Sequence, residues 1–305
     1  MTSVELKDFG SYRVGGRVHL VCDAPIQQIA FTATTRYPHD PNGHYCVESA
    51  YVQYFIPVKR NQHPPVVLLH GGGMSGSMWE NTPDGRPGWL QGLLLRGYEV
   101  HIIDNMERGR AGWLPDLWPG TPVSRTLEEA WTLFRLGEPE NFSARLPYPQ
   151  QQFPVSHLET FGLGFVPRWT STTPQQINTL QALLRRFEQV ILICHSQGGE
   201  IGFNAACTLP QHVAHLIAIE PSGFCDDLEG LSQIPVCIAY GDYLEHTQIW
   251  RTLHKRWDSY SQDLLSRGAS VKLINLAAVH PGASHFPMMD QASDIYLDAL
   301  LRNLA

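Results

Sequence analysis

Short, continuously apolar runs recur along this chain, and they alternate with segments in which apolar residues return every three or four positions. The runs cover residues 66–69, 100–103, 190–193, 216–219, 236–239 and 271–276. Runs of this length without polar positions are typical of parallel strands buried on both faces. The helical spacing covers residues 87–96, 174–187, 199–208, 248–267 and 290–303. Strands that alternate with helices predict an α/β fold with a mostly parallel central sheet flanked by helices.

Two earlier segments show a different pattern. Residues 11–22 and 46–57 are rich in Tyr and Val and alternate polar with apolar positions between Gly, Asn and Pro turns. This alternation predicts antiparallel strands that precede the parallel part of the sheet. The length allows one large α/β domain or two small ones, and we expect residues 1–305 to form a single domain.

One connection between predicted elements is too long for a simple crossover. Residues 105–173 separate the second buried run from the next helical pattern, and they are rich in Pro and aromatic residues, including Trp113, Trp118, Trp131 and Trp169. Insertions of this size at one edge of a sheet are usually functional. We therefore predict a cap over the site, with a purely structural subdomain as the alternative.

Charge and composition exclude several classes of partner. The formal net charge is −7 and the basic residues are scattered, whereas nucleic acids select basic surfaces. No apolar run approaches the roughly 20 residues of a membrane span. The first residues carry Glu5 and Asp8 and no apolar core of a signal peptide. We therefore expect a cytoplasmic protein without nucleic-acid or membrane partners, whose six irregularly spaced cysteines are free thiols.

The most informative segment joins a buried strand to a helix through a serine. An apolar run ends at Cys194-His195, Ser196-Gln197-Gly198-Gly199 follow, and helical spacing begins at once. This is the context of a nucleophile elbow, in which a sharp turn lifts the serine hydroxyl above the sheet. The helix N-terminus behind Ser196 offers free N–H groups to a developing oxyanion. The alternative is a Ser/Gly turn that only caps the helix.

A glycine-rich loop follows the first buried run. His70-Gly71-Gly72-Gly73 lies well before the elbow, and glycines allow backbone N–H groups to approach one oxygen atom closely. A phosphate-binding loop is a poorer interpretation, because no lysine follows in the required spacing. We interpret His70 as a structural hydrogen-bonding residue of the loop rather than as a base.

A catalytic histidine is expected after the last strand. Ser284-His285-Phe286-Pro287 lies in a Gly/Pro loop between that strand and the C-terminal helical pattern, whereas His280 lies nearer to the strand. The order Ser, then acid, then His is the one that this kind of fold uses. We therefore assign the catalytic base to His285.

The acid has two candidates. Its commonest place is the fourth position of the loop after the run 236–239, and that position holds Leu244, although Asp242 lies nearby. One run earlier, residues 216–219 lead directly into Glu220. A glutamate at the end of a buried apolar strand is costly to desolvate unless it is paired, and there it could orient a histidine. We assign the acid to Glu220 and keep Asp242 as the alternative.

Several sequence motifs resemble a small family of bacterial and fungal α/β-hydrolase esterases. They are GSYRVGGRV (10–18), YVQYF (51–55), HGGG (70–73), WENTPDGRPGW (79–89), HSQG (195–198), EP (220–221) and SH (284–285). The resemblance implies the α/β-hydrolase fold, a Ser–His–Glu triad, oxyanion donors at Gly72 and Gln197, and often a homodimer. The chain departs from the family at residues 104–110, where DNMERGR replaces the usual D-x-x-G-x-G-x-S.

Together these features predict acyl transfer without a metal or organic cofactor. His285 takes a proton from Ser196, the serine attacks an ester carbonyl, Glu220 stabilises the imidazolium, and Gly72 and Gln197 bind the oxyanion. The aromatic residues of the insertion, with Trp79 and Trp89, predict a small-molecule ester with a hydrophobic or aromatic part. The alternatives are a biosynthetic member of the fold that carries out lactonisation, thioester release or another non-hydrolytic step, and a ligand binder without activity.

Overall fold

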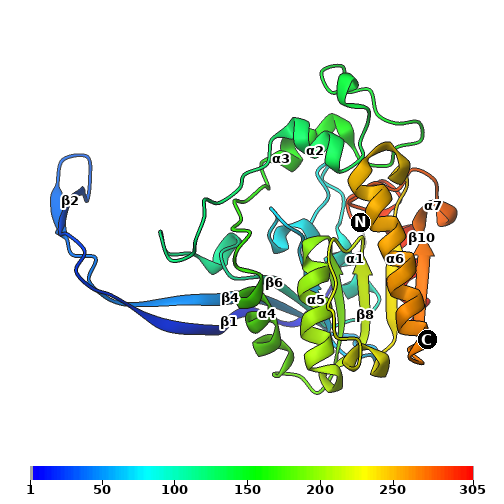
Figure 1. Cartoon of the computed structure of the whole chain (residues 1–305), viewed down its shortest axis with the longest axis horizontal. Coiled ribbons are helices and arrows are strands. Elements are labelled where there is room, and N and C mark those ends of the chain that lie inside the picture. The colour runs from blue at the N-terminus through cyan, green and yellow to red at the C-terminus, as the bar shows by residue number, and fades with distance from the viewer. Residues whose placement is uncertain (1–2, 305) are drawn as a thin grey trace.

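The structure is a computed structural model that describes residues 3–304, and an eight-stranded sheet forms its centre (Figure 1). The strand order is β1-β4-β6-β5-β7-β8-β9-β10. The strands of this sheet are β1 (Leu6–Val21), β4 (Gly43–Pro57), β5 (Val66–Leu69), β6 (Val100–Asp104), β7 (Val190–His195), β8 (Val213–Ile219), β9 (Val236–Tyr240) and β10 (Val271–Asn275). β5 to β10 are parallel, and β4 and β1 are antiparallel additions at one edge. The predicted fold class and the predicted strands of the sheet are confirmed.

Helices cover both faces of the sheet because alternate strand residues point to opposite sides. Val66 and Leu68 face one core cluster, whereas Val67 and Leu69 face the other. The first cluster contains residues of α1 (Trp89–Leu95) and α8 (Ser293–Leu301). The second contains residues of α4 (Thr173–Leu184), α5 (Gln197–Thr208) and α6 (Gln248–Ser266), which lie together in front of the sheet in Figure 1.

The N-terminal strands extend far beyond the sheet. β4 pairs with β6 only from Tyr51 to Phe55, whereas its pairing with β1 runs on to Gly43. The two strands therefore continue as a two-stranded arm, blue in Figure 1, which ends in the short pair β2 (Gln27–Ala30) and β3 (Arg36–His39). The sequence predicted the antiparallel strands but not the length of the arm.

The insertion of residues 105–173 contains two short helices that the sequence did not predict. α2 (Leu127–Leu133) and α3 (Leu158–Gly162) lie beyond the carboxyl ends of the parallel strands (Figure 1). Thr126 caps α2, since its side chain accepts a hydrogen bond from the N–H of Glu129. A third short helix, α7 (Leu276–Val279), follows β10. No helix within residues 3–304 is long and apolar enough to cross a bilayer.

Candidate active site

Ser196 lies at the sharp turn between β7 and α5. Its φ is 53° and its ψ is −119°, a strained conformation for a residue with a side chain. The turn is held because the Ser196 N–H donates to Ile219 O at 2.9 Å and the Ser222 N–H donates to Ser196 O at 3.1 Å. Ser196 is half-buried, while its neighbours in β7 and at the start of α5 are buried. Ser196 thus lies in a tight turn at the N-terminus of α5, directly after the carboxyl end of β7.

Cys194 stands where nucleophile elbows commonly have a glycine, and the helix makes room for it. The Cys194 side chain is fully buried, and a Cβ placed on Gly202 would lie 2.8 Å from its sulfur. Gly202 lies in α5, so the missing side chain there accommodates the larger residue in β7. The substitution therefore leaves the turn intact.

His285 and Glu220 form a short hydrogen bond from different loops. Nδ1 of His285 donates to Oε2 of Glu220 at 2.5 Å, and both side chains are buried. Burial lowers the pKa of His285, which Glu220 opposes, so the imidazole is neutral at pH 7. Its Nε2 forms no hydrogen bond within residues 3–304 and is the nitrogen available to a serine hydroxyl. The ring centroid of His285 lies 4.5 Å from that of His195, the residue directly before Ser196. The histidine therefore lies beside the serine turn.

A residue that the sequence analysis missed, Arg135, pairs with Glu220. Nη1 and Nη2 of Arg135 donate to the two carboxylate oxygens at 2.9 and 2.5 Å, and Gly241 N–H donates to Oε1 at 2.7 Å. Burial alone would raise the pKa of Glu220, but Arg135 and His285 hold it at about 2. The carboxylate is therefore charged at every working pH. An arginine between apolar neighbours in the sequence Leu133-Phe134-Arg135-Leu136 was the signal for it.

Asp242, the alternative acid, is engaged elsewhere. Its Oδ1 accepts from Tyr243 N–H at 2.8 Å and its Oδ2 accepts from Gly282 N–H at 3.1 Å. No hydrogen bond joins it to His285 in the described part of the chain. The geometry therefore brings Glu220, and not Asp242, to the histidine.

The glycine loop lies against the serine turn. A Cβ on Gly71 would lie 3.1 Å from Cβ of Ser196, and one on Gly72 would lie 2.9 Å from Oε1 of Gln197. His70 Nδ1 donates to Gly71 O at 2.9 Å, while its Nε2 accepts from Asn105 N–H at 3.1 Å. Because a trans peptide points its N–H opposite to its C=O, the Gly72 N–H points away from His70. His70 is thus a structural residue of the loop, as expected.

Three further residues position the histidine loop. His195 Nε2 donates to His285 O at 2.8 Å. Asp290 accepts from the N–H and the hydroxyl of Ser284 at 2.8 and 2.6 Å. Arg86, within the WENTPDGRPGW motif, donates to the carbonyl oxygens of residues 289–291.

Trp79 and Trp89 of the same motif are buried in the core, so they pack the fold and do not line a surface for substrate.

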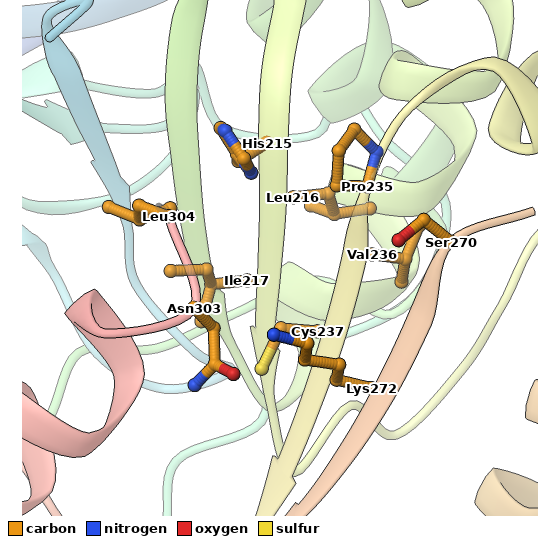
Figure 2. Close-up of a pocket in the computed structure, with 10 residues that line it drawn as sticks. All are labelled: His215, Leu216, Ile217, Pro235, Val236, Cys237, Ser270, Lys272, Asn303 and Leu304. Carbon is orange, nitrogen blue, oxygen red and sulfur yellow. The ribbon is translucent and has the colours of Figure 1, made fainter.

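One surface pocket lies away from the serine, histidine and glutamate described above. It is lined by His215, Val236, Lys272 and Asn303, among others, at the amino ends of β8, β9 and β10 (Figure 2). It is at the opposite ends of the strands from Ser196 and Glu220, so it is no part of the serine site.

Within residues 3–304, no group of three or more His, Cys, Asp or Glu side chains is arranged to hold a metal ion.

Known proteins share this architecture. Residues 64–249 match the family model described as alpha/beta hydrolase fold. A probable secreted lipase, phiG, from a fungal species (strain ATCC 74256) is 31% identical over 199 residues, which cover 59% of this chain and 51% of that protein. The chain thus spans about half the length of this relative. A bacterial esterase of known structure superposes with a TM-score of 0.85 at 28% identity, covering 100% of this chain and 98% of its own.

Proposed function

The chain belongs to the alpha/beta hydrolase fold family, and on that premise we propose that it is a serine esterase that cleaves a carboxylic ester through an acyl-enzyme. The observation that carries this proposal is the hydrogen bond between His285 and Glu220 beside the strained turn at Ser196. Similarity to a bacterial esterase over nearly the whole of both chains, and to a lipase, supports a carboxylic ester hydrolase.

In the proposed mechanism His285 Nε2 takes the proton of Ser196 as its Oγ attacks the ester carbonyl. Glu220 accepts the hydrogen bond of Nδ1–H, fixes the tautomer and stabilises the imidazolium. The N–H groups of Gly72 and Gln197 bind the oxyanion; the latter is free because the first residues of a helix lack intrahelical acceptors. The imidazolium then protonates the leaving alcohol, and water, deprotonated by His285, releases the acid.

We further propose that residues 105–173 act as a cap and that the substrate has a hydrophobic part. Phe134 of the insertion stacks on the His285 ring with centroids 5.2 Å apart, and its carbonyl accepts from His285 N–H at 3.3 Å. A pocket beside the glycine loop is lined by Met74, Met78, Phe161 and Met289, together with polar residues such as Ser77, Asn81 and Thr160. Its methionine and phenylalanine side chains suit a hydrophobic acyl or alcohol group of an ester.

The test is covalent labelling combined with turnover. A fluorophosphonate should modify Ser196, identified by peptide mass, and Ser196→Ala should lose both labelling and hydrolysis of p-nitrophenyl esters. Labelling of another serine would overturn the assignment. Labelling of Ser196 without hydrolysis of any ester in the panel would favour the non-hydrolytic alternative, a biosynthetic step such as lactonisation or thioester release, which the fold does not distinguish.

Two further proposals concern location and assembly. A cytoplasmic location stays a prediction, and the fungal relative is described as secreted. A homodimer is likewise proposed, and the two-stranded arm is the element that we expect to form its interface.

A further inference from the structure

Arg168 of the insertion is fixed beside the glycine loop. Its N–H and C=O pair with Val123 at 3.1 and 2.8 Å, and Val166 N–H donates to Gly73 O at 2.9 Å. These bonds hold the segment from residue 166 to 168 against the loop. The guanidinium reaches over Gly72, because a Cβ placed there would collide with Nη1 of Arg168. A cation therefore lies next to the proposed oxyanion donor.

A second arginine approaches the same place. Arg108 is fully buried, and its Nη2 donates to Oε1 of Gln197 at 3.3 Å, the oxygen that also lies close to Gly72. Its Nη1 has no hydrogen-bond partner in the described residues. Burial lowers the pKa of Arg108 to about 10, with Glu107 opposing and Arg168 reinforcing this shift. Two guanidinium groups thus converge on the amide of Gln197.

The neighbouring carboxylates leave one of these cations without a partner. Glu107 pairs with Arg108 at 3.2 Å, and Glu129 pairs with Arg125 at 2.6 Å. Burial lowers the pKa of Arg168, which Glu107, Glu200 and Glu129 oppose from a distance. No carboxylate in residues 3–304 comes within 4.0 Å of that guanidinium, and it forms no side-chain hydrogen bond there. A half-buried cation without a partner is costly to desolvate. A bound anion would offset that cost.

We propose that Arg168, supported by the free Nη1 of Arg108, binds a carboxylate of the substrate beside the oxyanion loop, so that the enzyme acts on esters with an anionic group. The inference rests on the proposed esterase function and specifies its substrate class. A guanidinium suits this task because its fork of donors matches the two oxygens of a carboxylate. The pocket near Met74 and the cationic subsite then recognise different parts of one molecule.

A different role for the same residue predicts a different result. If Arg168 only added positive charge near the oxyanion, it would stabilise the transition state of every ester alike. A matched pair of substrates separates the two roles. Mono-p-nitrophenyl adipate and p-nitrophenyl hexanoate have the same leaving group and the same six-carbon acyl chain, and differ in a terminal carboxylate.

The experiment compares kcat/KM for the two esters in wild type, Arg168→Gln, Arg168→Lys and a control, Arg145→Gln. Arg145 lies on the same insertion, but its guanidinium pairs with Glu159. Wild type should prefer the adipate ester. In Arg168→Gln, kcat/KM for the adipate ester should fall about 10- to 100-fold more than kcat/KM for the hexanoate ester, the value of a charge-assisted hydrogen bond. Arg168→Lys should retain part of the preference, and the control all of it.

Equal losses for both esters, or no loss for either, would overturn the proposed subsite. Titration calorimetry in the Ser196→Ala background gives a readout that does not need turnover: the adipate ester should bind more tightly than the hexanoate ester, and Arg168→Gln should abolish the difference. Fluorophosphonate labelling of Ser196 in each protein tests the esterase proposal separately. A labelled, active enzyme that binds both esters equally therefore refutes the subsite alone.

Discussion

Arg135 and Glu220 form a bidentate ion pair in the protein interior, with both side chains fully buried. The pair connects the insertion to the proposed catalytic acid across 85 residues of sequence. Arg135 Nε also donates to Asp242 O at 2.7 Å, and its guanidinium lies 4.6 Å from the ring centroid of Trp250. Its place is therefore set from three sides, and through Glu220 it sets the place of His285.

Replacing Arg135 should affect both rate and pH dependence. The positive charge of Arg135 lowers the pKa of His285, and the base must be neutral to act. Without that charge the imidazolium is favoured, so the acidic limb of the kcat/KM profile should move to higher pH. Arg135→Lys keeps the positive charge but loses the bidentate guanidinium, so we expect it to lower kcat with little shift of the acidic limb. Arg135→Gln removes the charge, so we expect it to shift the acidic limb to higher pH.

The unfolding free energy provides the control for this prediction. Removing one partner of a buried ion pair costs about 3–5 kcal/mol, so Arg135→Gln should also have a lower melting temperature than wild type. Arg135→Lys retains the charge, so its melting temperature should fall less. A purely structural role predicts a lower melting temperature with an unchanged pH profile in the surviving folded enzyme. That result would contradict the positioning role of Arg135.

The identity of the acid is tested by two amide substitutions. Glu220→Gln removes the charged acceptor of the His285 Nδ1–H, so kcat should fall by several orders of magnitude, comparable to the roughly 10⁴-fold loss on replacing the acid of serine proteases. Asp242→Asn should retain most activity, because within residues 3–304 the Asp242 carboxylate accepts only from backbone N–H groups of Tyr243 and Gly282. The reverse ranking of the two variants would move the acid to Asp242.

The tryptophans of the insertion should behave differently from one another. Trp113 is 57% exposed, whereas Trp118 is 6% exposed and packs with Met106 and Trp169. Trp118→Ala should lower the unfolding free energy by about 3–5 kcal/mol. Trp113→Ala should leave the melting temperature nearly unchanged and alter the ranking of p-nitrophenyl esters by acyl length, because its ring lies 5.2 Å from that of Trp169, next to Arg168. An unchanged ranking would show that Trp113 does not shape the pocket.

The proposed homodimer is tested through the arm. The arm exposes apolar side chains, with Phe31 71% exposed and Leu20 53% exposed. A two-stranded ribbon is marginally stable alone, and a second copy with two-fold symmetry is the commonest partner of such a surface. Light scattering should give a dimer for the wild type and a smaller mass for the double variant Leu20→Ser, Phe31→Ser. A wild-type monomer at every concentration would refute the proposal.

The sequence was sufficient where one local pattern decides the structure. Every apolar run became a strand of the sheet, because continuous burial on both faces allows few alternatives, and the serine turn followed from the strand–Ser–Gly–helix pattern. Arg135 and Arg168 were missed because their importance depends on distant partners, Glu220 and Gly72. Both lie in the insertion, where helices are short and no periodicity marks which side chains turn inward.

The buried carboxyl group of Asp290 should make the free energy of unfolding depend on pH. Burial raises the pKa of Asp290 to about 7, against the opposing hydrogen bonds from Ser284. The folded protein therefore binds the Asp290 proton more tightly than the unfolded chain, whose aspartates titrate near pH 3.9. The stabilisation from this group is complete below about pH 4 and is lost as pH rises towards 7.

Asp290→Asn isolates this contribution because asparagine imitates the protonated acid. The side-chain carbonyl oxygen of the asparagine can accept from Ser284 N–H, and its NH₂ group can donate to Ser284 Oγ. That hydroxyl oxygen has two lone pairs, one of which accepts from Phe286 N–H at 2.9 Å. Between pH 5 and pH 8 the unfolding free energy of the wild type should therefore fall more than that of Asp290→Asn, as measured by urea denaturation. Asp298→Asn is the matched control, because it alters a carboxylate of the same C-terminal region that is 52% exposed, and it should leave the wild-type pH dependence unchanged. Equal slopes in wild type and Asp290→Asn would show that Asp290 is ionised throughout this range, held charged by Ser284.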